Sequence, residues 1–129
     1  MNIPKELKYS RDHEWVKIEG TRATIGITDF AQSQLGDVVF VELPAVGDEV
    51  AAGSGLAVIE SVKAVSDIYA PLAGKVVETN ELLADAPETV NQDAYGTGWI
   101  AVLEISDLPQ PDALLDSEAY ERLVGEGGQ

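Results

Sequence analysis

The sequence contains no cysteine, only one histidine and few basic residues. Without cysteine, the chain forms no disulfide, has no thiolate nucleophile and binds no metal through sulfur. One histidine also argues against a metal site built from imidazole ligands. Among 129 residues, 8 Lys and Arg stand against 23 Asp and Glu, so the formal net charge is -15. Surfaces that bind nucleic acids or anionic membranes need clustered basic residues, so we expect neither partner.

Long hydrophobic runs are also missing. No apolar stretch approaches the roughly 18 residues of a membrane-spanning helix, and the start of the sequence lacks the apolar region of a signal peptide. We therefore expect a cytoplasmic protein with no membrane partner. Leu, Ile, Val and Phe make up about 28 % of the residues, above the roughly 20 % typical of disordered chains. The length is that of one domain, and we expect it to span residues 1–129.

Short β-branched segments separated by turn residues cover most of the chain. This spacing is typical of a small all-β barrel or sandwich. We expect strands at 14–18, 24–28, 38–43, 76–79 and 99–105. Two similar five-residue segments, 46–50 and 72–76, each place a glycine turn before a valine. Such near-repeats can pair across a pseudo-two-fold axis.

Helices are predicted in three places. Residues 29–35 form a short helix that Thr28 or Asp29 can cap and that Gly36 can end. The loop 80–98 can contain short helical turns at 81–83 and 88–90. The last helix is expected at 112–124, with Ser117 as a candidate cap inside it. The core of the domain is then about 8–106.

Several conspicuous side chains have ordinary structural explanations. Trp15, Phe40 and Trp99 are expected in the core because large aromatic side chains bury much apolar area. His13 stands beside Glu14, but no nucleophile accompanies the pair, so we expect a structural or surface role. Solvated acids are expected at four positions: Asp37, Glu42, Asp48 and Glu49.

The segment 55–71 allows two structures. Val58, Val62, Val65 and Tyr69 are spaced as on one helix face. Against a helix, the segment is rich in β-branched residues, which favour strands. Glycine and proline also bracket a length suited to two strands. We favour a hairpin with its turn at Lys63 and Ala64, although the turn lacks the glycine or asparagine of the commonest two-residue hairpins.

Lys63 would stand at the tip of this hairpin. Most lysines are simply solvated, and that remains the alternative here. The tip, however, lies far in sequence from other basic residues, between the small side chains of Ser61 and Ala64. A modifying enzyme can reach such a lysine, and a rigid hairpin fixes its direction. Those are the requirements of a lysine that carries a covalent group.

The residues around Lys63 closely resemble the lipoylation segment of the glycine cleavage system H-protein family. The resemblance is carried there by 60–64 and 66–71. Further matching segments are 8–9, 13–16, 26–29, 31–32, 35–41, 43–44, 90–91, 94–96, 98–100, 114–116 and Tyr120. Because many distant segments match in order, the resemblance covers nearly the whole chain. The departures, at 92–95 and in the glycine-rich tail, do not touch Lys63.

The resemblance implies a mostly β fold, a barrel-sandwich hybrid of two small antiparallel sheets with short helices and a C-terminal helix. It also implies lipoic acid in amide linkage to Lys63 and a carrier without catalytic activity. The implied partners are a pyridoxal-phosphate glycine decarboxylase, a tetrahydrofolate-dependent aminomethyltransferase, the flavoprotein dihydrolipoamide dehydrogenase and the enzymes that attach lipoate. The lysine and lipoyl chain would reach roughly 15 Å, so one arm could visit several active sites.

An arm loaded with an aminomethyl group ends in a cationic amine. Glu14 and Asp67 are the candidate carboxylates that would meet it. Asp67 lies four residues beyond the tip, and Glu14 lies in a segment resembling the family's arm-binding cleft. The alternative is that both are ordinary solvated acids.

Other functions compete with this interpretation. Lipoyl domains of 2-oxo acid dehydrogenases usually carry Asp before the lysine, where this chain has Val62, and are joined by a linker to a catalytic domain. Biotin carriers flank the lysine with methionine on both sides. An unmodified β-barrel interaction module remains open. A lipoate-relay protein would use the same modified lysine, so the sequence does not distinguish it.

Overall fold

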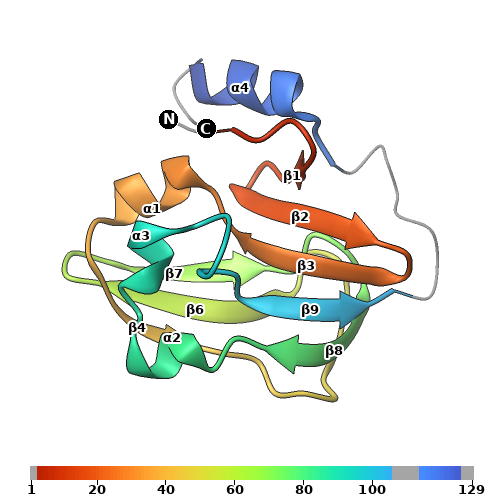
Figure 1. The fold of residues 1–129 in the computed structure, drawn as a ribbon, viewed down its shortest axis with the longest axis horizontal. Coiled ribbons are helices and arrows are strands. Elements are labelled where there is room, and N and C mark those ends of the chain that lie inside the picture. Colours follow the sequence, from red (N-terminus) through yellow and green to blue (C-terminus); the bar gives the residue numbers. More distant parts are fainter. Residues whose placement is uncertain (1–2, 106–113, 126–129) are drawn as a thin grey trace.

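The computed structural model describes residues 3–105 and 114–125 and consists mainly of two antiparallel sheets (Figure 1). The larger sheet has the order β1-β2-β3-β9-β8-β5 and the smaller has the order β4-β6-β7. The strands are β1 (Lys8–Tyr9), β2 (Glu14–Glu19), β3 (Arg22–Ile27), β4 (Val38–Glu42), β5 (Glu49–Val50), β6 (Gly55–Ser61), β7 (Val65–Tyr69), β8 (Gly74–Thr79) and β9 (Ala101–Glu104). The expected fold class, mostly β with two antiparallel sheets, is confirmed. The last strand is shorter than the expected 99–105.

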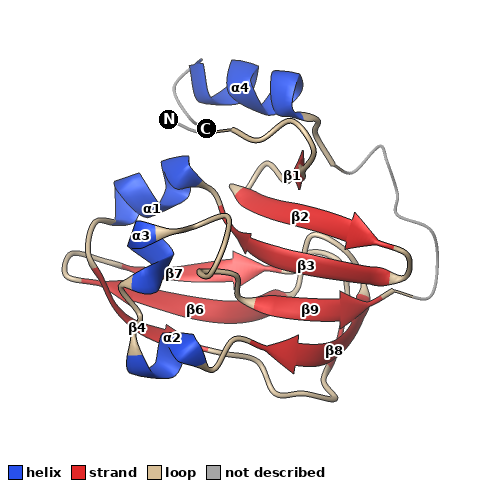
Figure 2. Cartoon of the chain, viewed as in Figure 1, coloured by secondary structure: helices blue, strands red, loops and turns tan. Residues whose placement is uncertain are grey.

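Within residues 3–105 and 114–125, four helices accompany the sheets, and Figure 2 shows them in blue. They are α1 (Asp29–Leu35), α2 (Leu82–Asp85), α3 (Thr89–Gln92) and α4 (Ser117–Gly125). Helix α1 has the predicted bounds because its ends are capped as expected. The Thr28 hydroxyl accepts a hydrogen bond from Ala31 N at 3.2 Å, and Gly36, at φ 79°, ends the helix in a backbone conformation that favours glycine.

The two short similar segments pair directly with each other. Strand β5 runs antiparallel to β8, with Glu49 opposite Lys75 and Val50 opposite Gly74. The turn before β5 is tied to the same strand, since Gly47 N donates to Val76 O and Val76 N donates to Asp48 O, both at 2.8 Å. The predicted pairing of the near-repeats is therefore confirmed, and it makes β5 the last strand at one edge of the larger sheet.

The prediction for the C-terminal helix is wrong at its start. The helix begins at Ser117 rather than at 112, and residues 112–113 lie outside the described part of the chain. Asp116, not Ser117, accepts the hydrogen bond of an N-cap, from Ala119 N at 2.8 Å. The preceding Leu115 instead forms a β-bridge with Tyr9. This pairing holds the chain extended up to the cap.

Alternate residues of the strands fill the space between the sheets. Ile25, Ile59, Val76, Ile100 and Leu103 are fully buried. Trp15 is buried as expected and donates its indole N–H to Ala94 O at 2.9 Å. None of the helices in the described ranges is long and apolar enough to cross a membrane.

The prediction that Phe40 lies in the core is wrong, since its side chain is 47 % exposed. Strand β4 has a register irregularity between Val38 and Phe40. A bulge of this kind interrupts the alternation of inward and outward side chains. Val38 and Val41 therefore face the core while Val39 and Phe40 both face outward.

Candidate functional site

The tip of the β6–β7 hairpin carries Lys63, and Ser61 organises it. Residues 62–64 connect the two strands, so the hairpin is confirmed, with a connection one residue longer than the expected Lys63–Ala64 turn. Ser61 N donates to Ala64 O at 2.8 Å. The Ser61 hydroxyl accepts from Ala64 N at 3.1 Å and from Lys63 N at 3.3 Å. The connection therefore forms without a glycine or asparagine, because the serine hydroxyl accepts hydrogen bonds from the N–H groups of the turn.

A second element fixes the tip from the side. Val62 N donates to Asp37 O at 3.0 Å, which joins the tip to the segment between α1 and β4. The stem of Lys63 lies over Gly36 in the same segment: a methyl group on Gly36 would lie 3.4 Å from Lys63 Cε. The hairpin tip projects beside α1 in Figure 1. The start of the lysine side chain is therefore directed by the end of α1 as well as by the turn.

Asn91, in α3, holds that segment in place. Its amide nitrogen donates to Gly36 O at 2.8 Å and to Gln32 Oε1 at 2.9 Å. Its amide oxygen accepts from Val38 N at 2.8 Å. The bonds at Gly36 O and Val38 N bracket Asp37, whose carbonyl receives the Val62 N–H. One half-buried side chain thus connects α1, β4 and, through Asp37, the lysine tip.

Lys63 itself is exposed. Within residues 3–105 and 114–125, the ion pairs are Lys17–Glu19 and Arg22–Glu104, and neither includes Lys63. An exposed amine that no carboxylate holds is available to a modifying enzyme.

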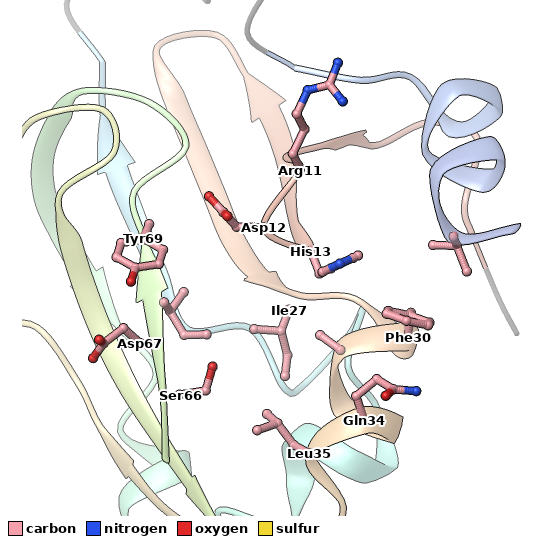
Figure 3. Close-up of a pocket in the computed structure, with 13 residues that line it drawn as sticks. Arg11, Asp12, His13, Ile27, Phe30, Gln34, Leu35, Ser66, Asp67 and Tyr69 are labelled. Carbon is pink, nitrogen blue, oxygen red and sulfur yellow. The ribbon is translucent and has the colours of Figure 1, made fainter. Parts of the chain in front are cut away.

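A pocket of about 740 Å³ opens between α1 and the edge strand β7, next to the end of α1 over which the Lys63 stem lies (Figure 3). In Figure 3, Leu35, adjacent to Gly36, lies at its lower end, with Ser66 on the left, Phe30 on the right and His13 above them. The lining is mixed, with apolar side chains on α1 and polar groups on the loop 11–13 and on β7. A chain attached to Lys63 would therefore have a pocket beside its point of attachment.

Asp67 and Glu14, the candidate arm contacts, are placed differently. Asp67 is exposed and lines the pocket from β7. Glu14 is only 1 % exposed and does not line the pocket. Its carboxylate accepts hydrogen bonds from the Ser10 hydroxyl at 2.8 Å and from Tyr69 N at 2.9 Å. Glu14 thus lies behind Tyr69, which does line the pocket, and is not a solvated acid.

Burial changes the chemistry of Glu14. Desolvation raises the pKa of its carboxyl to about 7, while the hydrogen bonds from Tyr69 and Ser10 oppose this shift. The charged form is disfavoured because the group is removed from water. Glu14 therefore changes charge near neutral pH, whereas an ordinary glutamate is fully ionised there.

His13 has the expected structural role. It adopts a positive φ of 69°, and its Nδ1 lies 2.8 Å from the Tyr120 hydroxyl. That hydroxyl also lies 2.6 Å from the Thr28 hydroxyl, the cap of α1. Tyr120 thereby ties α4 to the loop and the helix that border the pocket.

Sequence reasoning noted Ser61 only as a small neighbour of Lys63. It gave Gly36 only as the end of the helix 29–35, and it gave Asn91 no role at the site. For Ser61 a signal existed, because a serine before a three-residue connection can bond the turn's own N–H groups. Nothing local to Asn91 indicates its contacts, which reach 53 to 59 residues back along the chain.

Comparisons with known proteins agree with this geometry. Residues 7–127 match the family model described as "Glycine cleavage H-protein". The chain is 57 % identical to the glycine cleavage system H protein of Carboxydothermus hydrogenoformans, over 98 % of each chain. It is also 57 % identical to the corresponding protein of a Geobacillus species, covering 98 % of this chain and 100 % of that one. A crystal structure of a glycine cleavage system H protein from Mycobacterium marinum superposes with a TM-score of 0.87 at 39 % identity, covering 95 % of this chain and 99 % of that chain. The chain therefore belongs to the glycine cleavage H-protein family, the lipoyl carriers of the glycine cleavage system.

Proposed function

We propose that this chain carries lipoate on Lys63 and shuttles the aminomethyl group of glycine between the enzymes of the glycine cleavage system. The observation that supports the site is the position of Lys63 at the end of a hairpin. Its stem lies over Gly36, beside a pocket of about 740 Å³. An amide bond at the lysine nitrogen removes one positive charge and changes the formal net charge from -15 to about -16.

In this proposal, the protein attaches the lipoyl group, sets the direction of the lysine that carries it and provides a pocket for the attached chain. The lipoyl group supplies the sulfur chemistry that holds and releases the aminomethyl group. Ser61 and the Val62–Asp37 hydrogen bond set the direction in which Lys63 leaves the surface. The adjacent pocket offers the attached chain an apolar wall on α1 between visits to other proteins. Residues 1–129 act in this proposal as one non-catalytic carrier domain in the cytoplasm.

The proposed partners follow from this role. Glycine decarboxylase loads the carrier, the aminomethyltransferase unloads it onto tetrahydrofolate, and dihydrolipoamide dehydrogenase reoxidises it. A lipoate-attaching enzyme must act first. The strongly acidic surface would favour encounters with basic faces of these proteins, since complementary charge accelerates association.

Modification of Lys63 alone is the expected result when the protein is made with lipoate supplied. Lys63 is the exposed lysine at the hairpin tip, whereas Lys75 is exposed within strand β8 of the larger sheet. Intact mass distinguishes a lipoyl from a biotinyl adduct, and peptide mass spectrometry locates it. An adduct at Lys75, or one that persists in Lys63→Ala, would contradict the assignment.

We further propose that Asp67 and Glu14 hold the loaded end of the arm. Asp67 offers an exposed carboxylate in the pocket wall. Glu14 would act from behind Tyr69, where low exposure to water strengthens its attraction to a cation.

Asp67→Ala and Glu14→Ala are expected to shorten the lifetime of the aminomethyl-loaded protein. The measurement is the decay of the isolated loaded protein in each variant. Because the pKa of Glu14 is raised to about 7, its charge is present above pH 7 and is lost below it. Decay in the parent should therefore accelerate as the pH falls through 7, and this acceleration should vanish in Glu14→Ala. Equal lifetimes and equal pH profiles in parent and variants would refute the clamp.

A further inference from the structure

The outer face of the smaller sheet has an unusual composition for an exposed surface. Strands β4, β6 and β7 form the layer behind the larger sheet in Figure 2. None of these three strands contains a lysine or an arginine. Large apolar side chains of these strands are well exposed, among them Phe40 at 47 % and Val65 at 66 %. Val62, at the adjoining tip, is 68 % exposed.

The strand register places these groups in two neighbouring rows. Phe40 pairs with Glu60, and Glu60 pairs with Val65, so the first row is apolar, acidic, apolar. The second row reverses this order, with Glu42 opposite Val58 and Val58 opposite Asp67. Directly opposed side chains on one face of a sheet lie about 5 Å apart. The six residues therefore form a continuous checkerboard, which we call the outer patch.

A groove extends the outer patch away from the tip. Its volume is about 430 Å³, and Glu42, Val58 and Asp67 lie on its border with the patch. Asp48 adds a further carboxylate, and Pro44 and Val50 add apolar surface. The patch and groove thus carry four carboxylates around apolar side chains. The basic residue nearest in sequence to the first row is Lys63 itself.

We propose that the outer patch and its groove form the docking surface for the enzyme that acylates Lys63. The complementary surface would present aliphatic or aromatic side chains flanked by arginine or lysine. Exposed apolar groups rimmed by charge of one sign are typical of protein-binding surfaces rather than of solvated ones. This inference depends on the proposed acylation of Lys63.

The position of the patch favours the acylating enzyme over the other partners. In acylation, the Lys63 amine attacks the activated carboxyl carbon of a lipoyl adenylate. The new C–N bond forms as the bond to the nucleotide phosphate breaks, and a proton passes to water. The acylating active site must therefore reach the lysine nitrogen and cover the surface next to it, including Val62 and Val65. Partners that act on the end of a roughly 15 Å arm need no such contact.

Two matched double variants test the proposal. Phe40→Ser with Val65→Ser removes the exposed apolar anchors of the patch. Leu82→Ser with Val77→Ser removes two apolar side chains, one exposed on α2 and one half-buried on β8, that line neither the patch nor the groove. A lipoate–protein ligase with ATP and lipoate supplies the acylation assay. We expect the first pair to raise the KM for the carrier about tenfold or more with little change in kcat, as loss of contact anchors does. The second pair should match the parent.

The dependence of the KM on salt concentration tests the role of the carboxylates independently of the apolar side chains. The KM of the parent should rise with NaCl concentration, and Glu42→Gln should flatten this dependence because one attractive carboxylate is removed. The docking proposal would be overturned by an unchanged KM in the Phe40 and Val65 variant or by an equal rise of the KM in the control pair. It would also be overturned if the KM of the parent did not depend on the NaCl concentration.

The two proposals fail in different ways. If the parent is not acylated at Lys63, the proposed function fails. If the parent is acylated normally but the variants do not differ, only the docking surface fails. The Phe40 and Val65 variant, fully lipoylated by long incubation, should support glycine cleavage at the parent rate. A defect that appears only at this later stage would contradict the acylating enzyme as the occupant.

Discussion

Lys63→Arg is expected to abolish aminomethyl transfer while leaving the fold intact. Arginine keeps the positive charge and the aliphatic stem over Gly36, but its guanidinium does not form the lipoyl amide. Since Lys63 is exposed and forms no ion pair among the described residues, the free energy of unfolding should change by less than about 0.5 kcal/mol. A reconstituted glycine cleavage assay measures the transfer, and thermal unfolding measures the stability.

The matched control for this variant is Lys75→Arg, a replacement at an exposed lysine on β8. It should retain full transfer. Residual transfer by Lys63→Arg at an unchanged unfolding midpoint would refute the carrier role. A collapsed midpoint would instead make Lys63 a structural residue. Normal lipoylation of the parent without glycine cleavage would point to a lipoate relay.

Asn91→Ala is expected to have the largest effect on stability among the polar residues around the tip. The substitution removes the acceptor of Val38 N and the donor to Gly36 O and Gln32 Oε1. Three lost hydrogen bonds at half-buried groups cost about 2–3 kcal/mol. Denaturant unfolding measures this loss. Amide hydrogen exchange should also quicken at Val38 and at Val62, because the segment that receives the Val62 N–H loses its support.

Gln92→Ala is the control, because Gln92 lies next to Asn91 in the same helix and is exposed. Its stability should stay within about 0.5 kcal/mol of the parent, as for an ordinary surface substitution. If Asn91→Ala unfolds like this control, or if exchange at Val62 is unchanged, Asn91 does not support the tip.

Local patterns were sufficient for most elements of this fold. The helix α1 was predicted to its exact bounds because its start and end signals, Thr28 and Gly36, act within the helix itself. The hairpin was predicted because β-branched residues disfavour the competing helix. Local patterns do not predict which side chains are buried where this depends on the pairing of strands that are distant in sequence. Phe40 is exposed because of a bulge that depends on the register between β4 and β6.

For the same reason, the sequence predicted the modified lysine of the site but not the contacts between distant segments that surround it. Lys63 could be singled out because its neighbours in sequence are also its neighbours in space. The burial of Glu14 could not, since one of its two hydrogen-bond donors, Tyr69 N, lies 55 residues away. The platform made by Gly36 and Asn91 also depends on contacts between distant elements. Side chains that bridge elements leave no periodic signal in the sequence.

The hydrogen bond from Tyr69 N to Glu14 has a consequence for association between molecules. Strand β7 is an edge of the smaller sheet, and edge strands offer unpaired N–H groups to strands of other chains. At Tyr69 that N–H is already taken by a buried side chain of the larger sheet. A foreign strand would have to displace Glu14 to pair at this position. The Glu14 carboxylate thus also disfavours the pairing of a strand from another molecule with β7 at Tyr69, the kind of contact from which fibrils grow.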